Sequence, residues 1–363
     1  MFYLLYSLIF FGLGYFIVVH NSVKKNYLYF FYFAIVLFWG LSYIYAADTD
    51  GYMEKFEYDI RPISLIKKIR IDQQFEFGYS LLATICKTVT SGYWFFQVFV
   101  FGSEIFLIIQ SIKYFYRGKE WLYIIPLLFF MYPSMLGVFR QGIAVAIFIY
   151  AIQFIFAEKK PWRYFIYILI ATLFHKSAIV LVLVYLARYL KRYLSYDWLM
   201  FSILILCNLL YVLGFSLVNQ MDSLMLLFQD TSDTIEVVDK YAHYVEDFTG
   251  KMRYGVFKLL EIDVGFVLYT LYCKKDQDYL LMRFLLLLFI IISMAISGFI
   301  AHRLNYYFSI LYYFCFIRGV VSAFRMRKIH VDIPYLIIAV YMIWFFVFKN
   351  NYIEFEYRFL LFE

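Results

Sequence analysis

Residues 161–192 read PWRYFIYILIATLFHKSAIVLVLVYLARYLKR, and this stretch decides how the rest of the chain is arranged. Two apolar runs, 162–174 and 176–190, meet at a polar His-Lys pair. Pro161 suits the first turn of a helix, where its missing amide hydrogen costs nothing. The stretch therefore predicts either two short helices that fold back on each other or one long tilted helix.

The chain as a whole is strongly apolar. Of its 363 residues, 64% are hydrophobic and only 16% are charged, and the mean hydropathy is +0.73. A soluble chain would be about 45–50% apolar and about 25% charged. Apolar runs of membrane-spanning length recur from residue 1 to residue 349, which predicts an all-α polytopic membrane protein. The aromatic share of 24% fits either a sugar-stacking wall or a low-GC genome.

The same features exclude several other classes of protein. The net charge of +7 is carried by no basic stripe on a soluble domain, so no nucleic-acid partner is expected. The four cysteines have no spacing typical of a zinc site or a disulfide framework, and no metal or other cofactor is predicted. The run from Met1 to Val19 lacks a basic n-region and a cleavage site, so a first helix is predicted there.

The apolar runs predict about twelve helices in a single transmembrane domain, 1–363. Two long polar segments, 47–92 and 219–256, interrupt the pattern and are predicted to be extracytoplasmic loops. The helices are expected at 2–19, 27–46, 93–112, 121–136, 138–157, 162–174, 176–190, 198–218, 257–273, 281–300, 304–317 and 333–349.

Basic residues distinguish the two sides of the membrane. If 161–192 is a hairpin broken near His175, six short loops with two to four basic residues each fall on one side, as cytoplasmic loops do. A single tilted helix would move every later loop to the other side, so the hairpin is predicted. The six loops hold Lys24/Lys25, Lys113/Arg117/Lys119, Lys159/Lys160/Arg163, Arg188/Lys191/Arg192, Lys274/Lys275/Arg283 and Arg318/Arg325/Arg327/Lys328.

The first arm of this hairpin is too short to cross the bilayer. As an α-helix, 162–174 rises roughly 20 Å, against a hydrocarbon core of roughly 30 Å. His175 and Lys176 are therefore expected below the outer surface. Broken helices at that depth are tolerated only beside protein or a water-filled cavity, which predicts a polar cavity open to the outside.

Other ionisable residues are expected on the same outer side. Charges within a membrane are costly, and by default they mark functional sites. Arginine binds phosphate through a planar fork that never loses its charge, and a histidine or carboxylate can take the proton of an attacking hydroxyl. The pattern is typical of a site for a lipid-linked phosphate substrate. The residues are Asp48, Asp50, Glu76, Arg140, His175 and Arg303.

Each of these residues also has a purely structural interpretation. Arg140 and Arg303 could be snorkelling anchors, His175 could satisfy a backbone carbonyl, and the acids could belong to a solvated loop. Glu104 lies in the middle of an apolar run and is left open as a proton relay or a packing residue. The letters DTD at 48–50 match a metal-binding DxD motif, but three letters without supporting neighbours are a weak signal.

Five segments carry a resemblance that covers most of the chain. They are DTDGY (48–52), EFGY (76–79), FRQGIAVA (139–146), LFHKSA (173–178) and HRLNYYF (302–308). In this order they resemble the EpsG family of Wzy-like bacterial polysaccharide polymerases. The Arg-Gln-x-x-Ala and Phe-His-x-Ser-Ala segments are the most specific, and the others are looser.

The resemblance implies a GT-C-like glycosyltransferase of the bacterial inner membrane that needs no nucleotide sugar. Its substrate would be an oligosaccharide on undecaprenyl pyrophosphate, taken from the membrane lipid. The growing glycan would be transferred onto the non-reducing end of another lipid-linked repeat unit, on the periplasmic or exterior side. The product would be O-antigen, capsule or exopolysaccharide, and a chain-length regulator is a plausible partner.

The resemblance also implies roles for individual residues. Arg140 and Arg303 would bind the pyrophosphate. Activation of the acceptor hydroxyl would fall to one of His175, Asp48, Asp50 and Glu76. The sugar path would be lined by Tyr52, Tyr79, Gln141 and Tyr306.

Functions of other classes stay open beside the polymerase. An O-antigen-type ligase would use the same Arg and His residues with a different acceptor. A flippase for lipid-linked oligosaccharide would need polar residues on both sides of the bilayer and internal repeats, and neither is visible. An acyltransferase would need a His–Asp or Ser constellation that is not seen. A structural membrane partner would not explain two isolated arginines and a histidine at one depth.

Overall fold

The computed structural model describes residues 12, 25–43, 49–63, 76–115, 138–156, 161–215, 256–276, 278–296, 298–329, 332–344 and 358–359. The predicted helices 2–19 (apart from Gly12) and 121–136 lie outside them, as do Asp48 and almost all of the loop 219–256. Contacts divide the chain into two units. Unit 1 comprises Met1–Tyr185 and Phe324–Glu363, and unit 2 comprises Leu186–Ala323. The single transmembrane domain stays a prediction.

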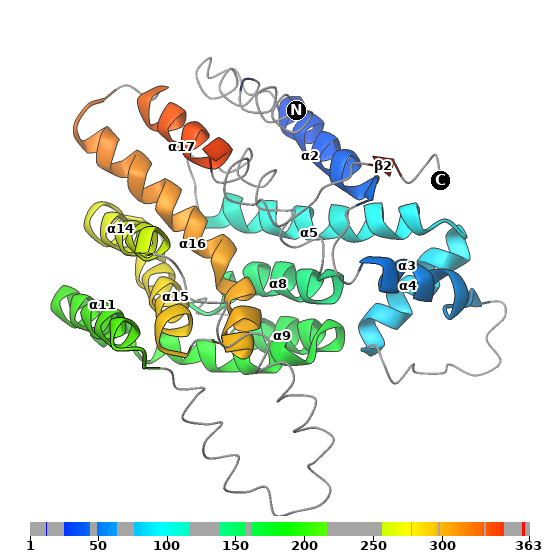
Figure 1. Cartoon of the computed structure of the whole chain (residues 1–363), viewed down its shortest axis with the longest axis horizontal. Coiled ribbons are helices and arrows are strands. Elements are labelled where there is room, and N and C mark those ends of the chain that lie inside the picture. Colours follow the sequence, from blue (N-terminus) through cyan, green and yellow to red (C-terminus); the bar gives the residue numbers. More distant parts are fainter. Residues whose placement is uncertain are drawn as a thin grey trace, which may run out of the picture. The chain divides into compact units, whose positions relative to one another are not determined.

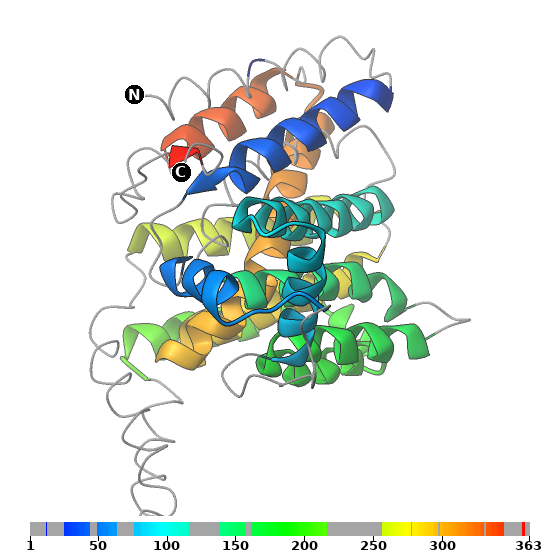
Figure 2. The same ribbon diagram turned by 90° about the vertical axis from the view of Figure 1, so that its right-hand side faces the viewer.

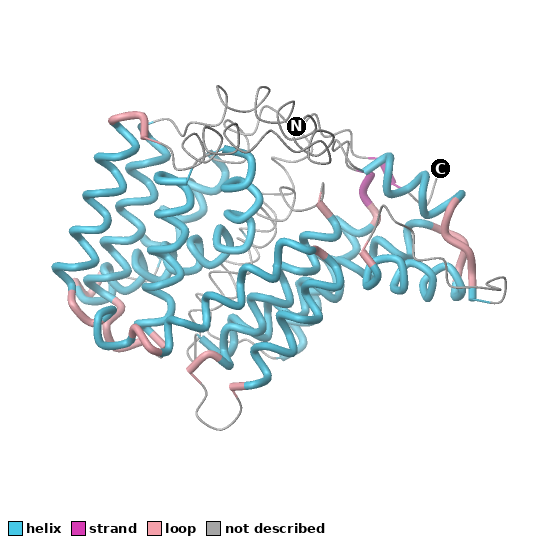
Figure 3. The backbone as a smooth tube through the Cα atoms, turned by 90° about the horizontal axis from the view of Figure 1, so that it is seen from below, coloured by secondary structure: helices cyan, strands magenta, loops and turns pink. Residues whose placement is uncertain are grey.

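Helices make up nearly all of the described chain (Figure 3), which confirms the predicted all-α class. The strands among the described residues form one short antiparallel pair, with Ser42 opposite Phe359. Unit 1 contains α2 (Lys25–Gly40), β1 (Ser42–Tyr43), α3 (Thr49–Tyr58), α4 (Phe77–Val89), α5 (Tyr93–Phe115), α8 (Phe139–Ala151) with the 3₁₀ turn η3 (Ile152–Phe154), α9 (Trp162–Phe174), most of the 3₁₀-helix η4 (Lys176–Arg188), α17 (Asp332–Trp344) and β2 (Arg358–Phe359).

The helices α9 and η4 form the predicted hairpin. Helix α9 ends at Phe174, and His175 leaves helical geometry with φ −152° and ψ 117°. The Tyr164 hydroxyl donates to the Leu181 carbonyl oxygen at 2.6 Å, and the Tyr164 ring stacks on Tyr185 with centroids 5.9 Å apart. In one continuous helix Tyr164 and Leu181 would lie about 25 Å apart. The hairpin is therefore confirmed.

The two arms of the hairpin are wound differently, and their burial patterns follow the winding. In α9 the buried residues Tyr164, Ile168 and Ala171 are spaced by four and then three positions, as an α-helix requires. The second arm, η4, is a 3₁₀-helix of 13 residues with three residues per turn. Its buried residues recur at every third position and form a single stripe. They are Ala178, Leu181, Val184 and Ala187.

Helices α5 and α8 pack side by side and run parallel (Figure 1). Several of their contacts share one register, because the contacting residues are 38 positions apart in the sequence. Three such pairs are Phe101 with Phe139, Glu104 with Gly142, and Ser111 with the carbonyl oxygen of Ile149. The register lets the depth of any residue on α8 be expressed as a position along the longer α5.

Two other pairs of packed helices in unit 1 are antiparallel. Helix α2 packs on α5, and α8 packs on α9 (Figures 1 and 2). Both directions, and the parallel course of α5 and α8, are those that the predicted alternation of helices requires. The contacts that define them are Tyr32–Gly102 and Gln97–Trp39 for the first pair, and Tyr150–Tyr167 and Phe154–Arg163 for the second.

The segment 47–92 is more ordered than the predicted loop, because it holds the helices α3 and α4. The Lys87 ammonium donates to the carbonyl oxygens of Phe56 and Glu57 and so satisfies the C-terminal end of α3. The sequence does contain a signal for α4. Its buried residues Tyr79, Ala83 and Cys86 have α-helical spacing, but the polar flanks obscured it.

Unit 2 contains α10 (Lys191–Leu194), α11 (Asp197–Val212), α14 (Val256–Tyr272), α15 (Tyr279–Ile291), the π-helical turn η5 (Ile292–Ile296) and most of α16 (Gly298–Met326). Helices α11 and α14 are antiparallel, with contacts from Asn208 to Asp263 and from Phe201 to Phe266. Helices α14 and α16 are parallel, because Gly265 lies against Tyr312 and Gly319 lies against the Tyr269 backbone. These directions also match the predicted alternation.

The position predicted for the turn between helices 281–300 and 304–317 is wrong. Helix α16 runs without interruption from Gly298 to Met326 and includes Arg303. The irregularity lies earlier, in η5. The polar letters around Arg303 suggested a turn, but polar residues are also tolerated inside a helix that presents them on one side.

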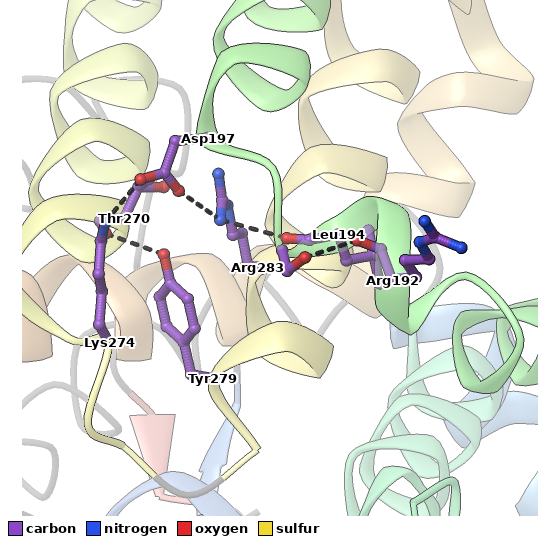
Figure 4. Close-up of polar contacts among 8 residues, drawn as sticks. Arg192, Leu194, Asp197, Thr270, Lys274, Tyr279 and Arg283 are labelled. Atoms are coloured by element: carbon purple, nitrogen blue, oxygen red, sulfur yellow. Dashed lines mark hydrogen bonds and ion pairs between the residues drawn. The ribbon is translucent and has the colours of Figure 1, made fainter.

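Three of the predicted cytoplasmic loops meet at one end of unit 2. Asp197 accepts hydrogen bonds from Lys274 at 2.5 Å and from the fully buried Arg283 at 2.8 Å (Figure 4). Asp276 pairs with both Nε and Nη2 of Arg318, at 2.8 and 2.7 Å. Two carboxylates thus join the three loops. Asp197, which follows the first loop, binds basic residues of the second, and Asp276 of the second binds Arg318 of the third. Arg303 precedes Arg318 by 15 positions on α16, about 22 Å along the axis, and so lies toward the other end of this unit.

Two helices among the described residues are long and apolar enough to cross a membrane, Tyr93–Phe115 and Arg303–Met326. Several shorter apolar helices accompany them, among them those that contain Phe139–Phe154 and Trp162–Phe174. The shorter helices are the ones that carry the polar residues at the break of the hairpin and at the start of α8.

Candidate active site

A salt bridge between Arg140 and Glu76 lies at the N-terminal end of α8. Arg140 Nη1 donates to Glu76 Oε2 at 2.6 Å, a length typical of charge-assisted hydrogen bonds. Arg140 Nε donates to the Tyr52 hydroxyl at 3.1 Å. The Arg140 side chain is 25% exposed and that of Glu76 is 11% exposed. Solvent therefore reaches the cation, while its carboxylate partner is nearly covered.

The position of Glu76 depends on how α4 packs against α9. Glu76 is the last residue before α4, and Gly78 lies two positions later against the backbone of Leu173. A Cβ at Gly78 would lie 2.8 Å from the Leu173 carbonyl oxygen. Only glycine permits this approach, so the glycine of EFGY brings Glu76 to the end of α9 where the hairpin turns. Sequence reasoning missed this role.

Aromatic rings form the floor beneath the salt bridge. The ring of Phe139 contacts four others: Tyr52 and Phe101 with centroids 5.3 Å away, Tyr93 at 6.3 Å and Phe96 at 6.4 Å. All five rings are buried. A polar contact beside such an apolar floor is stronger than one in water, because the local dielectric constant is low.

Three of the predicted sugar-binding residues lie inside this packing. Tyr52, Tyr79 and Gln141 are at most 4% exposed. The Tyr79 ring packs against Tyr52 at 5.5 Å and against Phe96 at 5.5 Å. The Tyr52 hydroxyl accepts a hydrogen bond from Arg140, and the sugar-binding role of these three residues stays a prediction.

His175 occupies the break of the hairpin, at the same end as Arg140 because α8 and α9 are antiparallel. Its Nδ1 lies 2.6 Å from the Ser177 hydroxyl, and its side chain is mostly buried. The His175 backbone is also satisfied, since its amide donates to Ala171 and its carbonyl accepts from Ala178. Ser177 was not singled out from the sequence, although it belongs to the segment LFHKSA.

The remaining predicted site residues lie on α3, on α16 or outside the described residues. Asp50 is exposed on α3, and Asp48 lies outside the described residues. Arg303 is exposed and Tyr306 is half-buried, and both lie on the part of α16 that belongs to unit 2. Their approach to Arg140 stays a prediction.

Arg140 can bind an anion, and Glu76, once displaced from Arg140, can act as a base. A guanidinium held by a carboxylate can exchange that carboxylate for a phosphate oxygen, because both are anionic acceptors that fit the same fork. The displaced Glu76 would then be an unpaired carboxylate close to the bound anion. His175, hydrogen-bonded through one ring nitrogen, offers a second proton acceptor at the same end of the helices.

One family model matches the chain, that of the EpsG family, over residues 25–359. No curated protein and no solved structure matches. EpsG is a family of Wzy-like polysaccharide polymerases, so the match points to a glycosyltransferase-like polymerase, and with the apolar helices it indicates a membrane protein. Since the matched segment covers nearly the whole chain, the chain belongs to the EpsG family.

Proposed function

We propose that the protein is a polysaccharide polymerase of the bacterial inner membrane. It transfers a growing glycan from undecaprenyl pyrophosphate onto the non-reducing end of a second lipid-linked repeat unit, at a site that faces the periplasm or exterior. The observation that carries the proposal is the Arg140–Glu76 salt bridge, in which a partly exposed guanidinium, a group suited to binding phosphate, lies beside a nearly covered carboxylate.

In this proposal Arg140 binds the donor pyrophosphate. The pyrophosphate displaces Glu76 and accepts two parallel hydrogen bonds from the guanidinium. As the bond between the anomeric carbon and the pyrophosphate oxygen breaks, negative charge grows on that oxygen, and the fixed cation stabilises it. Arg303 is proposed to bind the same group from α16.

The acceptor hydroxyl supplies the other half of the reaction. Its oxygen forms the new bond to the anomeric carbon, and its proton passes to a base. Glu76 is the first choice for this base, because donor binding releases it from Arg140. His175 is the second choice, with Ser177 holding its ring through Nδ1. Asp50 and Asp48 follow. Gln141 and Tyr306 are proposed to contact the sugar.

The depth of Arg140 supports a lipid-linked substrate. In the register of α5 and α8, Arg140 corresponds to position 102 of α5, which is about 14 Å from the N-terminal end of that helix. If α5 spans the bilayer, Arg140 lies well inside it. A pyrophosphate carried on a polyprenyl chain can reach that level without leaving the membrane, unlike a nucleotide sugar.

The test is polymerisation by the purified protein. A synthetic polyprenyl-pyrophosphate-linked repeat unit should be converted into a ladder of products. Arg140→Ala should abolish the ladder, and Arg140→Lys should weaken it about 100-fold, because the charge remains but the fork is lost. Arg163→Ala is the matched control, since Arg163 lies at the opposite end of α9. It should leave the ladder intact.

Other outcomes would replace the proposal. Movement of labelled lipid between leaflets without a ladder would indicate a flippase. Transfer of the glycan to a different acceptor, such as lipid A or a protein, would indicate a ligase. A full ladder from Arg140→Ala would remove Arg140 from the site.

A further inference from the structure

Glu104 is a buried carboxylate in the middle of the longest helix of unit 1. It is the twelfth of the 23 residues of α5 and is 2% exposed. It therefore lies about 17 Å from either end of a helix long enough to span a bilayer. A charge at that depth is costly, and a side chain of equal size without charge would fill the space more cheaply. Because of this cost, we expect Glu104 to have a role beyond packing.

The carboxylate lies directly against the backbone of α8. A Cβ at Gly142 would be 2.8 Å from Glu104 Oε1 and 3.4 Å from its Cδ. The glycine of FRQGIAVA therefore leaves the space that the carboxylate fills. Gly102, the glycine of α5, is less tightly packed than Gly142, because a Cβ there would be 3.3 Å from the Tyr32 hydroxyl.

The carboxylate of Glu104 lies against the first turn of α8. Gly142 is the fourth residue of α8 and lies two residues after Arg140. The amide of Gly142 already donates to the carbonyl oxygen of Val138 at 2.7 Å, but the first turn as a whole carries a partial positive charge. A carboxylate at this turn is electrostatically complementary to it, and it lies on the α5 side of the turn that carries the site arginine.

We propose that Glu104 is a positioning residue of the polymerase. Through Gly142 it holds the N-terminal turn of α8, and therefore the Arg140 guanidinium, in place when the donor pyrophosphate displaces Glu76. The inference rests on the proposed function. Glu104 is not proposed as a reacting group, because it contacts α8 at Gly142, which is two positions after Arg140 and so about 200° away around the helix axis.

The first test removes the charge and keeps the shape. Glu104→Gln should lower kcat for ladder formation by up to about 100-fold, as small misplacements of catalytic groups do. KM for the donor should change far less, because the lost interaction acts mainly in the transition state. The midpoint of thermal unfolding should stay that of the wild type. Wild-type kcat from folded Glu104→Gln would overturn the inference.

The second test moves the carboxylate by changing its neighbour. In Gly142→Ala the new methyl group should displace the flexible carboxylate, so kcat should fall although the chain still folds. Adding Glu104→Asp shortens the side chain by one methylene and makes room for the methyl group, so activity should recover. Adding Glu104→Gln does not shorten it and should give no recovery. Gly102→Ala is the matched control and should be active.

The two proposals fail in different ways. Wild-type protein that makes no ladder contradicts the polymerase itself. A wild-type ladder that persists in Glu104→Gln, or a Gly142→Ala defect rescued equally by Asp and Gln at position 104, contradicts only the role of Glu104. If Glu104→Gln does not fold, the double variant Gly142→Ala with Glu104→Asp decides, because failure to recover the activity lost in Gly142→Ala contradicts the role of Glu104.

Discussion

Tyr52 does two things at the site, and they belong to different parts of its side chain. Its hydroxyl accepts a hydrogen bond from Arg140 Nε, and its ring packs on Phe139. The ring holds α3 against the start of α8. The hydroxyl fixes the direction of the guanidinium, because a planar fork with one nitrogen anchored has little freedom to turn.

Tyr52→Phe should separate these two roles. The ring and its packing remain, but Arg140 Nε loses an acceptor, at a cost of about 1 kcal/mol in the free energy of unfolding. Ladder formation should slow several-fold, because the fork can rotate away from the donor pyrophosphate. Tyr58→Phe, an exposed tyrosine on the same helix, is the control and should change neither quantity. Equal effects in both variants would contradict the anchoring role.

At this scale the sequence predicts residue types better than residue pairs. Arg140, Glu76 and His175 could be singled out because charges are rare in so apolar a chain. The pairing of Arg140 with Glu76 could not, since 64 positions separate them. Gly78, Gly142 and Ser177 act by leaving space or holding a ring, and neither property is visible without the neighbouring element.

Helix α4 is an element that the site needs and the sequence hid. It begins directly after Glu76 and packs on α9 through Gly78. Its apolar positions have helical spacing, but it has only 13 residues between polar segments, so it reads as part of a long loop. The hairpin of α9 and η4 was predictable because the order of basic loops along the whole chain depends on it.

Gly78→Ala should destabilise the protein. A Cβ 2.8 Å from a backbone carbonyl oxygen cannot be relieved by a side-chain rotation. We expect overpacking to cost about 1–3 kcal/mol, more than the gain of up to about 1 kcal/mol from alanine in a helix. The midpoint of thermal unfolding in detergent should fall, and ladder formation should weaken as Glu76 shifts.

Gly51→Ala provides the contrast for this measurement. Gly51 lies on α3, and a Cβ added to it would have no heavy atom within 4 Å, so alanine meets no neighbour there. Its unfolding midpoint should rise slightly or stay unchanged. A shift of the same sign and size in both variants would mean that the approach of α4 to α9 is not tight.

For the molecule as a whole, the directions of the packed helices agree in each unit with the alternation predicted from basic loops. Such agreement is expected because positive charges act on every loop, so a sequence-wide pattern averages over local errors. The pattern of basic loops does not predict how far along a helix a given residue lies. The start of α8, the break at His175 and the continuous course of α16 past Arg303 depend on packing between elements.

The basic end of unit 2 makes stability depend on pH. Burial alone would raise the pKa of Asp197, but hydrogen bonds and charges of Lys274 and Arg283 outweigh it and lower the pKa. A carboxyl with a lowered pKa stabilises the fold above its unfolded value, about 3.9, and this stabilisation is lost as the pH falls through the folded value. The temperature at the midpoint of unfolding should therefore fall as the pH is lowered below about 4.

Asp197→Asn identifies the contribution of this residue. At neutral pH the variant should unfold at a lower temperature than the wild type, because Arg283 keeps its burial and loses its carboxylate partner. As the pH falls, the difference should shrink. Asp50→Asn, at an exposed position on α3, serves as the control. A difference that stays constant with pH would contradict the assignment.

The packing of α5 against α8 also has a consequence for how the two helices evolve. Residues 104 and 142 share one small volume, so a mutation at either position changes which residues selection can accept at the other. A lineage that acquired alanine at 142 would be expected to carry the shorter aspartate at 104, and a lineage with glutamate at 104 to keep glycine. Insertions within either helix would break the pairing, whereas changes of length between the helices would leave it intact.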